Sequence, residues 1–302
     1  MLLSLCIPTN GVLEWVLPVL ESIYNQNVDE SLYEVIVSDN GNSEEFRQAL
    51  ESYKMSHSNL IYKKTYAQQF MNQVEAFKMA SGEFIKFVNH RDLFVNGTVE
   101  YLIRLVQNNL DEKPVMFFSN GTRRIKECER KVADFDEFIR TLSYMSSWSG
   151  GTAIWKRDFE KIPEDYEYNI LFPHTGFLFA AKSSASYIVS DRKIFQSLKT
   201  DETKKGNYKL YKAFGVDFPN LVFQLEKEKS ITKKTCNKVM QDMKFFLAQQ
   251  YMEHEIMKNH CSYDLQGFQD YVGIYFHPTE IIVLGWMKYT KKRILHKFFV
   301  RK

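Results

Sequence analysis

Polar side chains that could hold a nucleotide follow two short apolar segments near the start of the chain. Thr9 and Asn10 come soon after an apolar run that ends at Ile7, and Asp39 follows a second run that ends at Val37. A nucleotide base needs in-plane hydrogen bonds and a ribose needs acceptors for its hydroxyls, and a carboxylate can supply either. Because the residues around Asp39 are also common in turns, this segment alone fits a binding site or an ordinary turn.

A third apolar segment ends in the same way. Residues 84–88 lead directly into Asn89, His90, Arg91 and Asp92. An imidazole and a carboxylate can ligate a metal, whereas a guanidinium matches phosphate oxygens bidentately. Three successive segments of this kind favour a binding site over three unrelated turns.

Helical periodicity separates these apolar segments. We expect strands at residues 2–7, 33–37, 59–63, 84–88 and 115–118, alternating with helices at residues 13–24, 43–53, 68–80 and 97–109. Such alternation indicates βαβ units around a mostly parallel sheet. Ligands of open α/β sheets bind outside the carboxyl ends of the strands. The sequence therefore predicts an α/β fold that brings Thr9, Asp39 and Asp92 to one edge.

The pattern is less regular after residue 119. We expect a helix at 135–142, an apolar strand at 153–155 after a small-residue loop, and a short strand at 187–189; helical periodicity then dominates from 218 to 260. These changes predict an α/β domain of residues 1–215 and a helical extension of residues 216–302.

The composition excludes several classes of protein. Hydrophobic residues make up 44% of the 302 residues and the net charge is only +3, which is ordinary for a globular chain without a global polyanion-binding field. The four cysteines form no CxxC pair, so neither a disulfide framework nor a zinc site is expected. No apolar run reaches the ~20 residues of a membrane-spanning helix. We expect a cytoplasmic protein, or one attached to the inner face of the cell membrane.

The order and spacing of the three strand ends resemble family-2 glycosyltransferases with the GT-A (Rossmann-like) fold. The resemblance rests on residues 6–10, 36–44 and 80–85 with Asp92, and covers about residues 2–100 well and 115–190 loosely. It is strongest with the subgroup whose second strand ends in Ser-Asp-Asn, which includes abequosyltransferase-like enzymes of surface-polysaccharide assembly. The resemblance implies a nucleotide-diphosphate-sugar donor, a glycan or polyprenyl-linked acceptor, and inversion at the anomeric carbon.

The resemblance also assigns donor-binding residues. Pro8, Thr9 and Asn10 would line the base and ribose, Asp39 would contact the base, and Asn72 would lie near the nucleotide. A nucleotidyltransferase, the other class with such a crevice, would carry a Gly-rich basic loop after the first strand, and this chain lacks one.

The acidic motif departs from the family pattern. The family has two or three aspartates that hold a divalent metal against the diphosphate, whereas this chain has His90, Arg91 and Asp92. A single carboxylate is a poor magnesium site. Either His90 and Asp92 hold manganese together with the diphosphate, or Arg91 neutralises the diphosphate itself. A third alternative is a catalytically impaired partner subunit that binds the nucleotide sugar.

An inverting transfer needs a general base close to the acceptor hydroxyl. The loop at residues 148–152 resembles the family's acceptor loop, and the position of the base then falls near His174. A histidine can serve because its pKa lies near neutrality. Glu164, Asp165 and Glu167 are the alternatives, and a structural role for His174 is another.

The end of the chain predicts a second partner. Residues 286–302 mix Trp, Phe, Leu and Ile with seven Lys or Arg residues and contain no acidic residue. This composition is typical of an interfacial helix on an anionic membrane. A basic helix packed on the protein body is the alternative, and no nucleic-acid-binding motif accompanies the segment.

Overall fold

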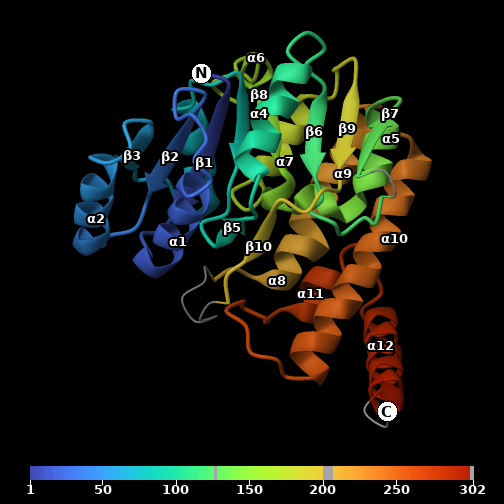
Figure 1. Ribbon diagram of the computed structural model, residues 1–302. Helices are drawn as coiled ribbons and strands as arrows, with labels where there is room; N and C mark the ends of the chain where they lie inside the picture. The colour runs from blue at the N-terminus through green and yellow to red at the C-terminus, as the bar shows by residue number, and fades with distance from the viewer. Residues whose placement is uncertain (126–127, 200–206, 300–302) are drawn as a thin grey trace. The chain divides into compact units, whose positions relative to one another are not determined.

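The computed structural model describes residues 1–125, 128–199 and 207–299, with side chains described up to residue 295 (Figure 1). The chain forms two compact units. The first contains Met1–Phe138 and Met145–Thr200, and the second contains Ile139–Tyr144 and Asp201–Lys302. The domain boundary expected near residue 215 stays a prediction.

A five-stranded sheet in the order β3-β2-β1-β4-β8 forms the centre of the first unit. Its strands are β1 (Leu3–Thr9), β2 (Tyr33–Asp39), β3 (Leu60–Lys64), β4 (Phe84–Phe87) and β8 (Ala153–Trp155). The first four are mutually parallel, and β8 is antiparallel to β4. The mostly parallel α/β sheet is therefore confirmed.

Five more strands lie in the described part of the first unit. They are β5 (Asp92–Phe94), β6 (Val115–Phe118), β7 (Glu129–Val132), β9 (Tyr187–Ser190) and β10 (Phe195–Ser197). Strand β9 pairs in parallel with β6 and antiparallel with β7, while β5 pairs antiparallel with β10.

One antiparallel bridge, from Phe117 of β6 to Thr152, fixes the direction of β6. The segment from Thr152 through β8 runs antiparallel to β4 and to β6, so β6 has the same direction as β4. Because β9 is parallel to β6, both strands run in the same direction as β1, β2 and β4. The carboxyl ends of these five strands therefore lie along one side of the first unit, here called the carboxyl edge.

Helices connect the strands of the first unit. They are α1 (Leu13–Tyr24), α2 (Glu44–Lys54), α3 (Asn72–Lys78), α4 (Thr98–Asn108), α6 (Lys156–Phe159) and α7 (Pro173–Ala180); α5 (Phe135–Leu142) runs from the first unit into the second. Ser43 caps α2 by accepting a hydrogen bond from the Phe46 backbone N–H at 3.1 Å. The helix expected at 68–80 is shorter, because a 3₁₀ turn at Gln69–Met71 precedes α3.

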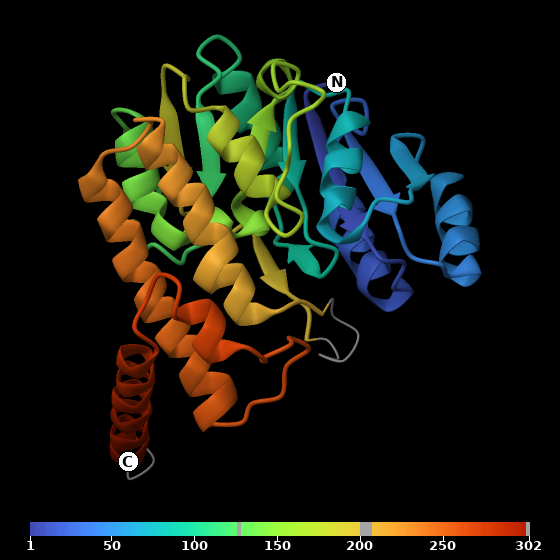
Figure 2. The ribbon, with the colours of Figure 1, turned by 180° about the vertical axis from the view of Figure 1, so that it is seen from behind.

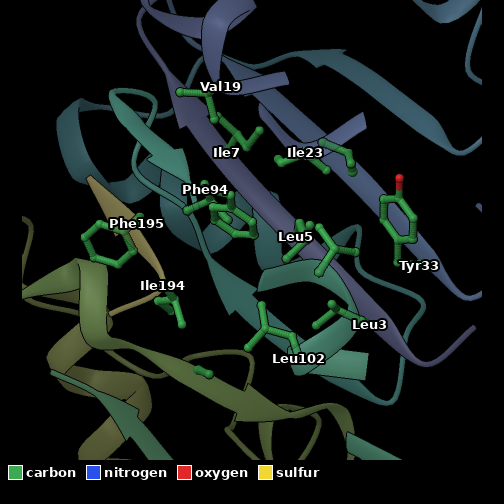
Figure 3. Close-up of a cluster of buried hydrophobic side chains, with 14 of the residues drawn as sticks. Leu3, Leu5, Ile7, Val19, Ile23, Tyr33, Phe94, Leu102, Ile194 and Phe195 are labelled. Carbon is green, nitrogen blue, oxygen red and sulfur yellow. The ribbon is translucent and has the colours of Figure 1, made fainter. Parts of the chain in front are cut away.

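The alternation of side chains along β1 explains the two apolar layers of the first unit. Leu3, Leu5 and Ile7 belong to a core that includes residues of α1, α2 and α4 (Figure 3). Cys6 points to the opposite face and joins a second core with residues of α3 and α7. Figure 2 shows these two helices on the face of the sheet that is turned away in Figure 1. Covering both faces leaves the carboxyl edge as the place where polar side chains collect.

The second unit is helical, as predicted for the extension. It contains α8 (Leu210–Lys212), α9 (Phe218–Lys227), α10 (Lys233–Gln250), α11 (Phe268–Val272) and α12 (Pro278–Phe299), with π-helical turns at Ala213–Asp217 and Tyr251–Ile256. Residues 300–302 of the predicted membrane-binding tail lie outside the described residues. Among the helices that the structure describes, none is long and apolar enough to cross a membrane.

Candidate active site at the carboxyl edge

The carboxylate of Asp39 is fixed at the end of β2. Thr9 and Asp39 are neighbours in the β1–β2 ladder, and Asp39 is buried. Its Oδ1 accepts a hydrogen bond from the backbone N–H of Gly41 at 2.7 Å, and its Oδ2 accepts one from the Tyr62 hydroxyl at 3.0 Å. Two donors from different elements therefore hold the carboxylate in one orientation beside Thr9.

The loops after β1 and β2 pass each other at backbone contact. A Cβ on Gly41 would lie 1.9 Å from the carbonyl oxygen of Asn10, and one on Gly11 would lie 3.1 Å from Oδ1 of Asp39. Only glycine fits at Gly41. Asn10 is exposed next to this contact, and Pro8 is half-buried within the ladder. The predicted donor residues are thus brought together with Asp39.

The side chain of Asn72 joins the ends of β1 and β2. Its Nδ2 donates to the carbonyl oxygens of Thr9 at 3.1 Å and Ser38 at 2.7 Å. Its Oδ1 accepts from the hydroxyls of Ser38 at 2.6 Å and Thr65 at 2.7 Å. These four bonds use the whole hydrogen-bonding capacity of the amide. The geometry therefore favours a positioning role for Asn72, and its predicted place near a nucleotide stays a prediction.

His90 and Arg91 both lie against Trp15 of α1. The His90 ring meets the indole edge-on at 5.1 Å between centroids, and the Arg91 guanidinium lies 5.3 Å from the indole centroid. The Nδ1 of His90 is 2.9 Å from the Thr9 hydroxyl. Burial, with the nearby charge of Arg91, lowers the pKa of His90 to about 3, so the imidazole is neutral at physiological pH.

Asp92 begins β5 and is buried at the carboxyl edge. Its Oδ1 accepts a hydrogen bond from the Ser197 hydroxyl of β10 at 2.6 Å. Burial raises the pKa of the Asp92 carboxyl, while the Ser197 hydrogen bond and the charges of Lys86 and Arg91 oppose that rise. The β5–β10 pairing therefore places a carboxylate with perturbed acidity where the acidic motif was expected.

The donor set does not fit a divalent metal ion. Asp92 is the single carboxylate of the expected motif, and one of its oxygens already accepts from Ser197. The Nδ1 of His90 is engaged by Thr9. The described part of the chain contains no group of three or more His, Cys, Asp or Glu side chains that could hold a metal ion. Metal binding by His90 and Asp92 stays a prediction that these contacts do not favour.

His174 lies at the start of α7 with both ring nitrogens engaged. Its Nδ1 is 3.1 Å from Oε1 of Gln73, and its Nε2 is 2.8 Å from the carbonyl oxygen of Ser147. A carbonyl oxygen only accepts, so Nε2 carries the proton. Burial lowers the pKa of His174 to about 4. The contacts favour a structural role, and its predicted role as general base stays a prediction.

The alternative bases lie between α6 and α7. Glu164, Asp165 and Glu167 are exposed there.

Trp148 begins the loop that resembles the family's acceptor loop, and its side chain is half-buried. Its ring lies 5.7 Å from that of Phe195, so Trp148 packs on β10.

Three side chains of the site were not anticipated. Trp15 supports the His90-Arg91 segment, Tyr62 holds Asp39, and Ser197 holds Asp92. The sequence contains one further signal of this kind: Lys86 is a charged residue inside an apolar strand, which indicates an unusual contact. Nothing near Ser197 in the sequence indicates its partner, because the two residues are far apart in the chain.

Comparisons with known proteins agree with this architecture. The sequence profile described as "Glycosyl transferase family 2" matches residues 4–173. No curated protein matches the sequence.

Solved structures show the same fold. The structure of S. aureus TarS 1-349 in complex with UDP-GlcNAc has a TM-score of 0.59 and 18% identity, with 86% of this chain and 76% of that chain covered. The longer S. aureus TarS structure has a TM-score of 0.55 and 18% identity, covering 84% of this chain but only 43% of that one.

A mannosyltransferase, PcManGT from Pyrobaculum calidifontis in complex with GDP-Man and Mn2+, has a TM-score of 0.50 and 13% identity, covering 94% of this chain and 86% of that one. The likeness to TarS confirms the predicted GT-A fold. Because the family profile spans more than half of the sequence, this chain belongs to glycosyltransferase family 2.

Proposed function

We propose that the protein is an inverting glycosyltransferase that moves a sugar from a nucleotide-diphosphate donor to a glycan or polyprenyl-linked glycan. The observation that carries this proposal is the Asp39 carboxylate, oriented by Gly41 and Tyr62 beside Thr9. The resemblance to abequosyltransferase-like enzymes supports a setting in bacterial capsule, O-antigen or related surface-polysaccharide synthesis.

The donor would bind with its base against Asp39. Uracil and guanine both present a ring N–H that a carboxylate accepts, and the related structures contain UDP, UDP-GlcNAc or GDP-Man. Thr9 and the exposed Asn10 would face the ribose. Asn72 would keep the β1 and β2 ends together through its four hydrogen bonds.

Arg91 would neutralise the donor diphosphate. Its guanidinium rests on Trp15, which limits the conformations open to a long side chain. A planar guanidinium can contact two phosphate oxygens at once. Since the residues near Asp92 do not fit a divalent ion, this proposal includes no step through a metal.

Asp92 would take the proton of the acceptor hydroxyl. It lies at the carboxyl edge, and burial raises the pKa of its carboxyl, which strengthens it as a base. Direct attack by the activated hydroxyl would invert the anomeric carbon, and the nucleoside diphosphate would leave.

Titration with UDP and GDP tests the donor site. Asp39→Asn keeps the size of the side chain but removes its charge, so we expect the Kd of the preferred nucleotide to rise about tenfold or more. Glu45→Gln is the control, because it removes one exposed carboxylate from α2. An unchanged Kd in Asp39→Asn would remove the base-binding assignment.

A catalytically impaired partner subunit is the second candidate function. The single carboxylate of the expected acidic motif favours it. Incubation with UDP-GlcNAc, GDP-Man and other nucleotide sugars, with and without manganese, separates the two functions. Release of nucleoside diphosphate supports the enzyme, whereas tight nucleotide binding without any turnover supports the partner subunit.

We also propose that α12 lies on an anionic membrane at the cytoplasmic face. Successive residues of a helix are rotated by about 100°, so Val283, Trp286, Met287 and Ile294 share one face, and all four are exposed. Lys291 and other basic residues accompany this face. Exposed apolar side chains beside basic ones suit an interface with anionic lipids.

A further inference from the structure

Two loops at the carboxyl edge are locked to each other by reciprocal side-chain bonds. The first loop follows β6 (residues 119–125), and the second follows β9 (residues 191–194). Asp191 of the second loop accepts hydrogen bonds from the backbone N–H groups of Arg123 at 3.0 Å and Ile125 at 2.8 Å, and from the Ser119 hydroxyl at 2.5 Å.

Asn120 of the first loop binds the backbone at the end of the second loop. Its Oδ1 accepts from the backbone N–H groups of Ile194 at 2.8 Å and Phe195 at 3.1 Å, and its Nδ2 donates to the carbonyl oxygen of Phe195 at 3.1 Å. Asn120 and Arg124 both have a φ of 52°, a left-handed conformation that costs side-chain-bearing residues free energy. We call these two joined loops the paired loops.

The paired loops present basic side chains. Arg124, Arg192 and Lys193 are exposed, and Arg123 is half-buried. Asp191 directs its carboxylate into the loop backbone. Among the described residues, none of the ion pairs includes Arg124, Arg192 or Lys193. The charge that the paired loops show to solvent is therefore mainly positive, although the small net charge of the chain gave no sign of it.

The second loop leads directly to the proposed catalytic carboxylate. It continues into β10, whose Phe195 is bound by Asn120 and whose Ser197 donates to Asp92. The paired loops follow β6 and β9, whereas the proposed donor site follows β1 and β2, so β4 and β8 separate them in the strand order. The connection to Asp92 through the β5–β10 pairing and the separation from the ends of β1 and β2 suit the acceptor.

Resting on the proposed glycosyltransferase function, we propose that the paired loops bind an acceptor glycan that carries anionic groups, either phosphates or carboxylates. Arg124 and Lys193 would contact successive anionic groups of the acceptor chain while an acceptor hydroxyl reaches Asp92. Basic side chains on a preformed backbone favour phosphate and carboxylate groups over the neutral hydroxyls of an uncharged glycan.

Binding assays on the full chain test this inference with three probes: short polyphosphate, oligogalacturonate and neutral dextran. We expect the wild type to bind one or both anionic probes with an affinity that falls as salt rises, and not to bind dextran. The preferred anionic probe then distinguishes phosphate from carboxylate. In Arg124→Gln/Lys193→Gln the affinity should fall about tenfold. Arg192 is kept, because its guanidinium packs on the Tyr101 ring at 4.2 Å.

Arg104→Gln/Lys234→Gln is the matched control, since it removes two exposed cations elsewhere. The control should bind the anionic probe like the wild type, and UDP or GDP binding should be the same in all three proteins. Equal probe affinity in the wild type and the loop variant, or an equal loss in the control, would overturn the inference. Nucleotide binding without any anionic-probe binding refutes the inference alone, whereas a wild type that binds no nucleotide refutes the proposed function.

Discussion

A lysine in the centre of an apolar strand shows how a single residue can organise the site. Lys86 of β4 is buried, and its ammonium donates to the carbonyl oxygens of Phe87 at 2.7 Å, Gly150 at 2.7 Å and Thr152 at 3.3 Å. These bonds tie β4 to the loop that leads into β8. Burial lowers the pKa of Lys86 to about 7, and the charge of Asp92 opposes that shift.

This shift predicts a pH-dependent stability. Above pH 7 the folded state releases the Lys86 proton, whereas the unfolded state keeps it up to the ordinary pKa of 10.5. The unfolded state then binds more protons, so folding stability rises with pH in this interval. Relative to Lys86→Met, the wild type should gain roughly 2–3 kcal/mol of unfolding free energy between pH 7 and pH 9, measured by urea denaturation.

Lys78→Met provides the control for the lysine prediction, because Lys78 is exposed on α3. Its unfolding free energy should follow the wild type across the same pH interval. If the difference in unfolding free energy between the wild type and Lys86→Met stays constant from pH 7 to pH 9, Lys86 keeps its proton in the folded state.

Residue types at strand ends could be predicted, but their hydrogen-bonding partners could not. Thr9, Asp39 and Asp92 lie at the carboxyl edge as expected, because the ends of parallel strands must meet there. The family resemblance assigned Asn72 and His174 to the site, but their polar atoms are largely occupied by protein groups. Such contacts join segments distant in sequence, so one sequence does not reveal them.

At the scale of elements, the donor side depends on how closely two strand-end loops approach. The Asn40 backbone N–H donates to the carbonyl oxygen of Thr9 at 3.0 Å, and the glycine that follows Asn40 leaves no room for a side chain. Direct backbone contact between the loops sets the distance between the Asp39 carboxylate and the residues after β1.

Gly41→Ala should separate these loops. Its Cβ would lie 1.9 Å from the Asn10 carbonyl oxygen, so the backbone must move. We expect a loss of about 1–3 kcal/mol in unfolding free energy and a rise of about tenfold in the Kd for the bound nucleotide. Gly97→Ala is the control: its φ is +78° and its Cβ would meet nothing within 4 Å, so it should cost about 1 kcal/mol without affecting nucleotide binding. Unchanged nucleotide binding in Gly41→Ala would contradict the role of the loop contact.

Apolar strands, including the three-residue β8, and periodic helices followed from the sequence, whereas β5 and β10 did not. Apolar runs and helical spacing predicted β1 to β4 and the helices between them, since a buried parallel strand is apolar on both faces. Strands β5 and β10 have three residues each and pair across about a hundred residues, so neither has a pattern of its own. That pairing nevertheless provides the Ser197 contact to Asp92.

For the molecule as a whole, the second unit contributes an exposed apolar helix face. Within that unit, Ile281 of α12 is fully buried, and a Cβ on Gly285 would lie 3.1 Å from the Tyr251 ring, so this side of α12 packs on its neighbours. Trp286 and Ile294, which lie on the opposite face, are 51% and 50% exposed. This distribution leaves an apolar face available to a lipid surface.

Vesicle co-sedimentation tests the membrane proposal. With vesicles of phosphatidylglycerol and phosphatidylcholine, Trp286→Ser/Ile294→Ser should weaken binding by at least about tenfold. The variant lacks two apolar side chains whose transfer from water into the lipid stabilises the bound state. High salt should weaken the wild type as well, since the basic residues of α12 contribute through the anionic headgroups. Met55→Ser/Ile170→Ser removes two exposed apolar side chains from the first unit and should bind like the wild type. If the α12 variant sediments with vesicles as the wild type does, the exposed face of α12 does not bind the membrane.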